Sequence, residues 1–208
     1  AILTVRAPGC YIANLGFNGS GATGGGILLD DDGSTKTAFG TTIENCHFKN
    51  CVGTTSTNAA TGGAIQWASA GNAWQVLIKG NRFYKNVGDI VMKGTSSSIP
   101  QDVVIEDNIF SGPAASVDCN IYVAADGING LIIRNNEFQA LPAMSGSNSL
   151  FVVLTGSVGI MSGNRFGSTG KTFGVAGDDG GTVPATVFMS ANYQEKATSG
   201  SGEIFRTA

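Results

Sequence analysis

The sequence predicts an all-β fold, a parallel β-solenoid of about seven coils with roughly 28 residues in each coil. Three observations support this prediction: a motif with Ile or Met first, Asn fourth and Phe sixth recurs, its spacing is nearly regular, and short apolar segments alternate with Gly-, Ser- and Thr-rich ones. The full motif occupies residues 78–83, 105–110, 133–138 and 161–166. Looser copies at 12–17 and 43–48 have Leu15 and Cys46 in the fourth position, and a last copy at 189–194 has Gln194 in place of Phe. Aligned on the fourth position, the intervals are 31, 35, 27, 28, 28 and 28 residues. Such a period is typical of stacked repeats.

Each motif position has a physical explanation in a coil. Side chains alternate along a strand, so the first residue and the Phe are expected to point into the core. The Asn follows the strand at a bend, where stacked side chains can bind one another and satisfy backbone groups. Stacked Phe rings add roughly 0.5–1.5 kcal/mol per pair. A second apolar segment is expected at 26–29, 64–67, 89–92, 120–123, 150–153, 172–175 and 203–205. With a brief strand around the Phe, each coil should hold three strands.

Two sets of positions are predicted to face outward beside the first motif residue. The position after it includes Glu44, Lys79, Glu106 and Arg134, which alternate in sign and favour a solvated charged face. The position before it is mostly apolar: Tyr11, Thr42, Leu77, Val104, Ile132, Ile160 and Phe188. In the downstream strands the outward residues are expected to be Leu28, Val91, Tyr122, Val152 and Phe205. Since soluble monomers rarely expose contiguous apolar stripes, we expect identical chains to associate.

The composition bounds the range of partners. Charged residues make up 13% of the chain and the formal net charge is −3, so we expect no nucleic-acid partner. No segment approaches the ~20 apolar residues of a membrane helix, so we expect no membrane insertion. Residues 1–208 are expected to form a single domain. Because the chain opens at Ala1 in repeat sequence, we expect it to be a fragment or a processed form of a longer chain.

The pattern Ile-x-x-Asn-x-Phe resembles the pectate-lyase-like right-handed parallel β-helices, and among them it is most similar to bacteriophage tailspike and tail-appendage proteins. The resemblance covers nearly the whole chain. It implies a right-handed single-stranded β-helix and a homotrimer in a virion tail appendage or an extracellular location. It also implies that the protein binds, or even depolymerises, bacterial surface polysaccharide.

Two alternatives stay open because one fold serves many functions. The first is a non-catalytic structural or adhesive β-helix segment of a viral appendage or surface protein. The second is a secreted polysaccharide lyase or epimerase. The calcium-binding Asp cluster of pectate lyases and the Asn-Thr-Asp strand of polygalacturonases are both absent from the sequence, which weighs against these two families.

Catalysis would make the protein a glycan depolymerase, either a glycoside hydrolase or a polysaccharide lyase. Hydrolysis needs two carboxyl groups about 5–5.5 Å or ~6.5–9.5 Å apart. Asp89 and Asp118 precede or begin the downstream strands of neighbouring coils, and they are the candidate catalytic pair. Tyr122, Asp126 and Lys93 are the candidate substrate-binding residues. Alternatively, the two acids end loops and cap turns, as Asp commonly does.

Other reactive side chains give weaker indications. The run 30–32 before Gly33 has oxygen ligands for Ca²⁺, but it lacks the fuller calcium-loop pattern and favours a solvated turn, as does the similar run 178–179. His47 is expected to point outward beside Arg82, away from Cys46. The four Cys residues match no zinc pattern and are expected to be free buried thiols. No cofactor and no metal are therefore expected.

Overall fold

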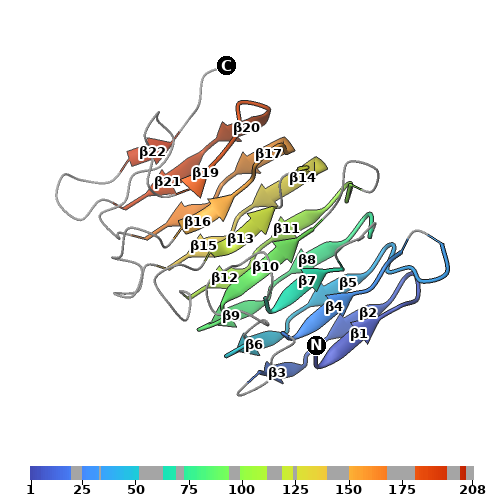
Figure 1. The fold of residues 1–208 in the computed structure, drawn as a ribbon. Coiled ribbons are helices and arrows are strands. Elements are labelled where there is room, and N and C mark those ends of the chain that lie inside the picture. The colour runs from blue at the N-terminus through green and yellow to red at the C-terminus, as the bar shows by residue number, and fades with distance from the viewer. Residues whose placement is uncertain are drawn as a thin grey trace.

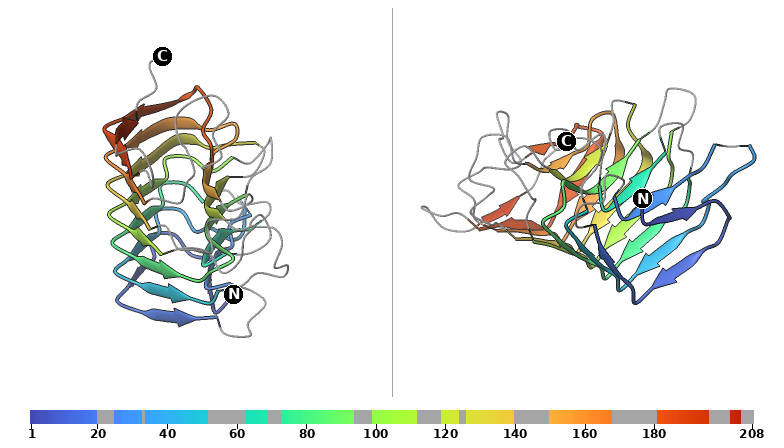
Figure 2. Two further views of the ribbon diagram at one scale, coloured as in Figure 1. Left: turned by 90° about the vertical axis from the view of Figure 1, so that its left-hand side faces the viewer. Right: turned by 60° about the horizontal axis from the view of Figure 1, so that its bottom comes forward.

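The computed structural model of the chain describes residues 1–19, 25–32, 34–51, 63–68, 73–93, 99–111, 119–123, 126–139, 150–167, 181–195 and 202–204. These residues form a parallel β-solenoid, and none of them lies in a helix (Figure 1). Each coil contributes one strand to each of three sheets, so the strands of a sheet lie one above another along the axis (Figure 2). The predicted fold class is confirmed.

The three sheets, which we call A, B and C in chain order, contain the following strands. Sheet A consists of β1 (Leu3–Val5), β4 (Ile27–Leu29), β7 (Ile65–Trp67), β10 (Gly88–Met92), β13 (Cys119–Val123), β16 (Leu150–Val153) and β19 (Gly181–Thr182). Sheet B consists of β2 (Tyr11–Ala13), β5 (Thr42–Glu44), β8 (Leu77–Lys79), β11 (Val104–Glu106), β14 (Asn129–Arg134), β17 (Val158–Ser162) and β20 (Val187–Ser190). Sheet C consists of β3 (Gly16–Asn18), β6 (His47–Lys49), β9 (Arg82–Tyr84), β12 (Ile109–Phe110), β15 (Glu137–Phe138), β18 (Arg165–Phe166), β21 (Asn192–Gln194) and β22 (Gly202–Ile204).

The spacing of about 28 residues holds over five turns of the solenoid, which we number coils 3 to 7. Their equivalent residues, from Asn81 to Asn192, are 27 or 28 residues apart. The two N-terminal coils are longer, and Cys46 lies 35 residues before its partner Asn81. The intervals of 31 and 35 residues seen in the sequence hold at this end, where the loops between sheets vary in length, so five and not seven coils have the predicted length of roughly 28 residues.

A ladder of asparagine side chains follows the corner between sheets B and C. Its members, Asn81, Asn108, Asn136, Asn164 and Asn192, are at most 2% exposed. In the middle of the ladder, Asn136 Oδ1 accepts hydrogen bonds of 3.0 Å from the backbone N–H and from Nδ2 of Asn108. Asn136 Nδ2 donates to the Ile105 carbonyl at 2.9 Å and to Asn164 Oδ1 at 3.0 Å. The predicted column is confirmed, and it satisfies backbone groups that the bend would otherwise leave buried and unpaired.

Cys46 occupies the ladder position of the second coil. Its backbone N–H donates to Asn81 Oδ1 at 2.8 Å, as the next Asn would. Its thiol donates to the Ile12 carbonyl at 3.8 Å, whereas the Asn81 amide reaches the equivalent Ile43 carbonyl at 2.9 Å. Burial raises the pKa of the Cys46 thiol, so the group remains a neutral donor. A thiol is a weaker donor than an amide, so the ladder is looser here.

A column of phenylalanine rings fills the core beside the ladder. Phe17, Phe48, Phe83, Phe110, Phe138 and Phe166 stack with ring centroids 4.7–5.1 Å apart and interplanar angles of 5–13°. Phe151 packs edge-on against the last two rings of this stack. Where the seventh coil has Gln194 instead of Phe, the glutamine is still buried. The predicted stacking is confirmed.

The bend after each strand of sheet B requires a left-handed backbone conformation. The residues there are Asn14, Asn45, Gly80, Asp107, Asn135, Gly163 and Ala191, with φ between 51° and 66°. Asn, Asp and Gly tolerate this region, whereas alanine has no side-chain group that favours it. Six of the seven coils therefore have a suitable residue at the bend, and Ala191 is the exception.

Three expectations about strands are wrong or lie outside the described residues. The last apolar segment does not continue sheet A, because β22 pairs antiparallel with β21 on sheet C. In sheet A, Val152 is in register with the inward Ile121, so the outward residue of β16 is Val153. Residues 172–175 and Phe205 lie outside the described residues, and the next described strand of sheet A is β19.

Candidate functional site

The structure gives Asp89 a buried position in β10. Asp89 is only 1% exposed. Its Oδ1 accepts a hydrogen bond from Asn86 Nδ2 at 2.8 Å, and its Oδ2 accepts one from Asn120 Nδ2 at 2.7 Å. Asn86 Oδ1 in turn accepts the backbone N–H of Cys51 at 2.9 Å. Burial, with the charge of Asp89 in support, raises the pKa of the Cys51 thiol to about 11. This geometry favours the alternative in which Asp89 satisfies buried donors between coils.

The other candidate residues around Asp89 are spread over the outer side of sheet A. Tyr122 is half-buried and in register with Val91, and Lys93 follows β10. Burial lowers the pKa of Lys93. Asp126 is exposed in the turn that leads to sheet B, and Asp118 lies outside the described residues. The proposed catalytic pair and its substrate-binding neighbours therefore stay a prediction.

The carboxylates of residues 30–32 are occupied by protein donors. Asp30 pairs with Arg6 at 2.7 Å, and Asp31, only 2% exposed, accepts from the Ala38 backbone at 2.8 Å. Asp32 Oδ1 accepts backbone N–H groups of residues 34–36 at 2.8–2.9 Å, and these bonds hold the pKa of Asp32 well below its usual range. The run is thus a hydrogen-bonded turn with one buried acid, and the expectation that it is simply solvated is corrected. No group of three or more metal-ligating side chains lies together in the described ranges.

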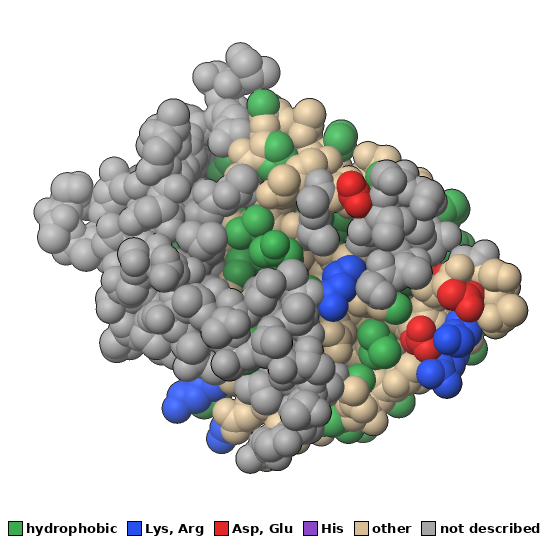
Figure 3. Space-filling view, in the orientation of Figure 1, with side chains coloured by type: hydrophobic (Ala, Val, Ile, Leu, Met, Phe, Trp, Pro, Cys, Tyr) green, Lys and Arg blue, Asp and Glu red, His purple; other side chains and the backbone are tan. Residues whose placement is uncertain are grey.

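The outer face of sheet C carries a concentration of positive charge on coils 2 and 3. We define the basic patch as His47, Lys49, Arg82, Tyr84 and Lys85, all of which are exposed. His47 is in register with Arg82, and Lys49 is in register with Tyr84. In Figure 3, Lys and Arg side chains project at the lower left, near the strands labelled β6 and β9 in Figure 1, without red side chains beside them.

The charges of the basic patch have no acidic partner. Among the ion pairs of the described residues, none includes Lys49, Arg82 or Lys85. Instead, the ammonium groups of Lys49 and Lys85 lie 5.8 Å and 5.2 Å from the centroid of the Tyr84 ring. Cation–π contacts of this kind stabilise exposed cations by about 0.5–1 kcal/mol, but they leave the positive charge uncompensated.

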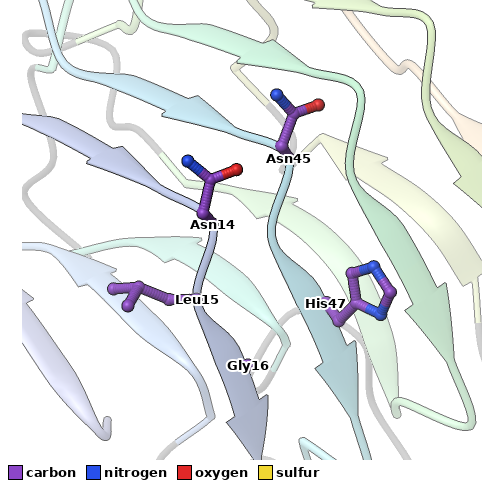
Figure 4. A pocket seen from close by; sticks show the side chains of 5 residues that line it. All are labelled: Asn14, Leu15, Gly16, Asn45 and His47. Carbon is purple, nitrogen blue, oxygen red and sulfur yellow. The ribbon is translucent and has the colours of Figure 1, made fainter.

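A shallow pocket of about 390 Å³ adjoins the patch at the corner between sheets B and C (Figure 4). Asn14, Leu15, Gly16, Asn45 and His47 line it. Figure 4 shows the amides of Asn14 and Asn45 projecting in the same direction from neighbouring coils, with His47 further along the second coil. The pocket therefore offers amide donors and acceptors, an imidazole and an apolar side chain, and His47 connects it to the basic patch.

The Asn45 amide depends on the glycine of the next coil. A Cβ atom on Gly80 would lie 2.7 Å from Asn45 Oδ1, and Gly80 has a φ of +65°. A side chain at this position would displace the amide and strain the backbone. Gly80 thus leaves room for one of the polar groups of the pocket.

The outer face of sheet B shows a second feature, an apolar stripe. Tyr11, Thr42, Leu77, Val104, Ile132, Ile160 and Phe188 are in register from coil to coil, as predicted. Tyr11, Ile160 and Phe188 are 67%, 45% and 54% exposed. The next residue of each strand carries the predicted charges. Glu106 forms an ion pair with Lys79 at 3.3 Å and accepts a hydrogen bond from Arg134 Nε at 2.7 Å. Glu44 accepts a hydrogen bond from the Tyr11 hydroxyl. The stripe is thus bordered by the ion-paired Glu106 and by Glu44, which is hydrogen-bonded to Tyr11 of the stripe itself.

Comparison with known proteins assigns no family. No family model matches the chain, and neither the curated proteins nor the solved structures include a significant match. The fold is therefore known from the structure itself. The described residues also include no helix that is long and apolar enough to cross a membrane.

Sequence reasoning found only part of this site. It placed His47 beside Arg82, and the structure confirms that the two are in register. It did not align the position two residues further along, where Lys49 faces Tyr84. Comparing the residues on both sides of each motif Phe, coil by coil, would have shown cations without an acid opposite them.

Proposed function

We propose that this protein binds polysaccharide through the outer face of sheet C, at the basic patch and the adjoining pocket. The observation that carries the proposal is the exposed basic patch, whose cations have no acidic partner in the described residues. It lies beside the pocket that the amides of Asn14 and Asn45 line. Amides, imidazole and guanidinium groups suit the hydroxyl and acidic groups of sugars. The repeat and the solenoid fold are compatible with a tail-appendage β-helix that recognises a bacterial surface polysaccharide.

Binding without cleavage fits the described acids best. Asp89 is buried and accepts two amide hydrogen bonds, so it is not presented to a ligand. On sheet C, Glu137 and Glu195 both pair with Arg165. A glycosidase needs carboxyl groups placed on both sides of the scissile bond. We therefore propose that the protein binds polysaccharide without cleaving it. Observed depolymerisation would contradict this part of the proposal.

A panel of capsular and O-antigen polysaccharides tests the proposal. We expect at least one to bind, with no release of reducing ends and no absorbance from unsaturated sugars. The double variant Asn14→Ala, Asn45→Ala should weaken that binding by about thirtyfold, since each lost hydrogen bond contributes about 1 kcal/mol. Asn135→Ala is the matched control, because Asn135 has the same left-handed backbone on coil 5, away from the pocket.

Three results would count against this function. Binding of no polysaccharide on a broad panel would reject it. Equal losses of affinity in the double variant and in the Asn135→Ala control would show that the binding site lies elsewhere. Release of oligosaccharides would convert the proposal from a binding module into a depolymerase.

A second proposal concerns the alternative role as a structural or adhesive segment. The apolar stripe on sheet B favours association of identical chains, because it is contiguous over all seven strands of that sheet. We propose that three copies pack through it, in a viral appendage or another extracellular assembly. Sedimentation should give a homotrimer for the wild type and a monomer for Ile160→Ser, Phe188→Ser, whereas an unchanged mass would contradict the role of the stripe.

A further inference from the structure

We infer that the polysaccharide is an anionic one, and that an acidic group of a sugar binds at the Lys49 and Lys85 ammonium groups beside the Tyr84 ring. This inference rests on the proposed function and names the ligand class of the same site. It follows from the arrangement of charge in the basic patch, which differs from every other cluster of charge in the described part of the chain.

Two like charges share one aromatic ring in this patch. Lys49 and Lys85 both lie within 6 Å of the Tyr84 centroid, and neither has a carboxylate partner in the described residues. The two ammonium groups repel each other, and the ring compensates this only in part. An anion beside the ring reduces this repulsion and can accept a charge-assisted hydrogen bond from an ammonium group. The charge of the patch therefore favours an anionic ligand.

The neighbouring side chains extend the site beyond a single charge. Arg82 is exposed one residue before Phe83, in register with His47 on the adjacent coil. Its guanidinium can bind a second acidic group through two parallel N–H donors. His47 and Lys49 lie on the same face of β6, roughly 7 Å apart along the strand. An extended ligand that crosses β6 and β9 would therefore meet cations at one end and the corner pocket at the other.

The described Lys and Arg side chains outside the patch, with one exception, each pair with at least one carboxylate. Arg6 and Lys36 pair with Asp30, Lys79 and Arg134 pair with Glu106, and Arg165 pairs with Glu137 and Glu195. The exception is Lys93, which is half-buried on sheet A. The chain as a whole has a net charge of −3, which opposes long-range attraction of any polyanion, so the ligand must be held by short-range contacts at the patch. An acidic polysaccharide fits better than a nucleic acid, because its hydroxyl groups also suit the amides of the pocket.

The test compares two variants with the same change in net charge. The patch variant is Lys49→Gln, Arg82→Gln, Lys85→Gln, and the control is Arg6→Gln, Lys36→Gln, Arg165→Gln, which removes three cations from ion pairs elsewhere. Calorimetric binding would be measured for polygalacturonate, dextran and a single-stranded DNA of matched charge. The thermal midpoints of both variants would establish that they are folded.

The expected result is a loss of polygalacturonate affinity of about tenfold or more in the patch variant, since charge-assisted bonds are among the stronger ones. The control should change the affinity by less than about twofold, and added salt should weaken wild-type binding. Equal losses in both variants would overturn the inference, because net charge and not the patch would then attract the ligand. Tighter binding of DNA than of polygalacturonate, lost in the patch variant, would also overturn it.

Failure of this inference can be told apart from failure of the proposed function. If a neutral polysaccharide binds in a manner that depends on Asn14 and Asn45 but not on Lys49 and Lys85, the anionic ligand class is wrong and polysaccharide binding stands. If none of the polysaccharides binds to the wild type, both fail.

Discussion

Coils 1 to 3 and coils 5 to 7 have the same three strands and differ in the side chains that these strands carry. At the C-terminal end the ladder consists of asparagines, and the charges on sheet C are paired through Arg165. At the N-terminal end a thiol replaces an amide in the ladder, and the cations of β6 and β9 have no acidic partner among the residues that the structure describes. The C-terminal coils keep the amide ladder and pair the charges of sheet C, although coil 7 has Ala191 at the bend and Gln194 in place of Phe, whereas coils 2 and 3 leave charged groups available at the surface.

This difference has a physical reason. A stacked fold is stabilised mainly by contacts between adjacent coils, so most coils must repeat the same buried groups. Outward positions carry no such constraint and can hold unpaired charge at a small cost in stability. Natural proteins tend to violate local consistency at functional sites. The corner pocket lies on coils 1 and 2, which depart from the regular spacing, and the basic patch spans coil 2 and the first regular coil, coil 3.

The largest expected effect comes from breaking the phenylalanine stack at two places. Phe110→Ala should lower the free energy of unfolding by about 3–5 kcal/mol, because the ring is fully buried and stacked on both sides. Phe17→Ala should cost at least about 1 kcal/mol less, since Phe17 stacks on one ring only and is 5% exposed. Urea unfolding followed by circular dichroism measures both, and equal losses would contradict the difference between the interior of the stack and its N-terminal end.

The next effect compares the two kinds of ladder residue. Asn136→Ala removes four buried hydrogen bonds and should cost about 2–4 kcal/mol. Cys46→Ala should cost about 1 kcal/mol, because only weak thiol bonds are lost. Cys46→Asn should instead raise stability by about 1 kcal/mol by extending the amide ladder. A destabilised Cys46→Asn variant would show that the N-terminal ladder position has no room for an amide.

The charged column of sheet B gives a prediction for pH. Glu106 is largely buried, which raises its pKa, but Arg134 and Lys79 outweigh the burial and hold the pKa below the usual 4.5. Because the folded state has the lower pKa, Glu106 stabilises the fold fully above pH 4.5, and this contribution is lost as the pH falls through the folded value. Glu106→Gln should cost about 1 kcal/mol at pH 7, since both partners are half-exposed. The difference in urea midpoint between the two proteins should shrink below pH 4.5, and a difference independent of pH would contradict the role of the charge.

The smallest effect concerns the left-handed bend of the seventh coil. Ala191→Asn should stabilise the protein by about 0.5–1 kcal/mol, because Asn tolerates the φ of 51° that alanine disfavours. Asn135→Ala, at the equivalent bend of coil 5, should destabilise it by a similar amount. Both residues are exposed, so packing does not complicate the comparison of their unfolding midpoints. Changes of the same sign in both variants would contradict the argument.

Much of the core could be predicted from the repeat alone. The inward Ile and Phe positions and the buried Asn all recur at a fixed place in each coil, because equivalent residues of adjacent coils meet the same neighbours. The expectation failed where the chain between sheets varies in length. Val152 was assigned to the wrong side of sheet A, and the last segment was expected to continue a sheet that it does not join. A one-residue change of register reverses which side chains face outward.

The candidate site could be predicted only in part, for a related reason. The burial of Asp89 depends on Asn86 in its own coil and on Asn120 in the next, and neither contact follows from the spacing of acids in the sequence. Whether a lysine is neutralised depends on the side chain one coil away and on its rotamer. The sequence shows which residues are charged, but not which charges are paired.

The sequence by itself determined the winding of the chain, since the period of Asn and Phe leaves one way to bury both in a stack. Tertiary structure decided how each outward charge is compensated, because that depends on lateral neighbours between 27 and 35 residues away. It also decided that Asp89 is a buried acceptor and that Lys49 and Lys85 share one ring. Local periodicity specifies the inside of a solenoid, whereas its surface chemistry arises from side chains that meet only after the coils have stacked.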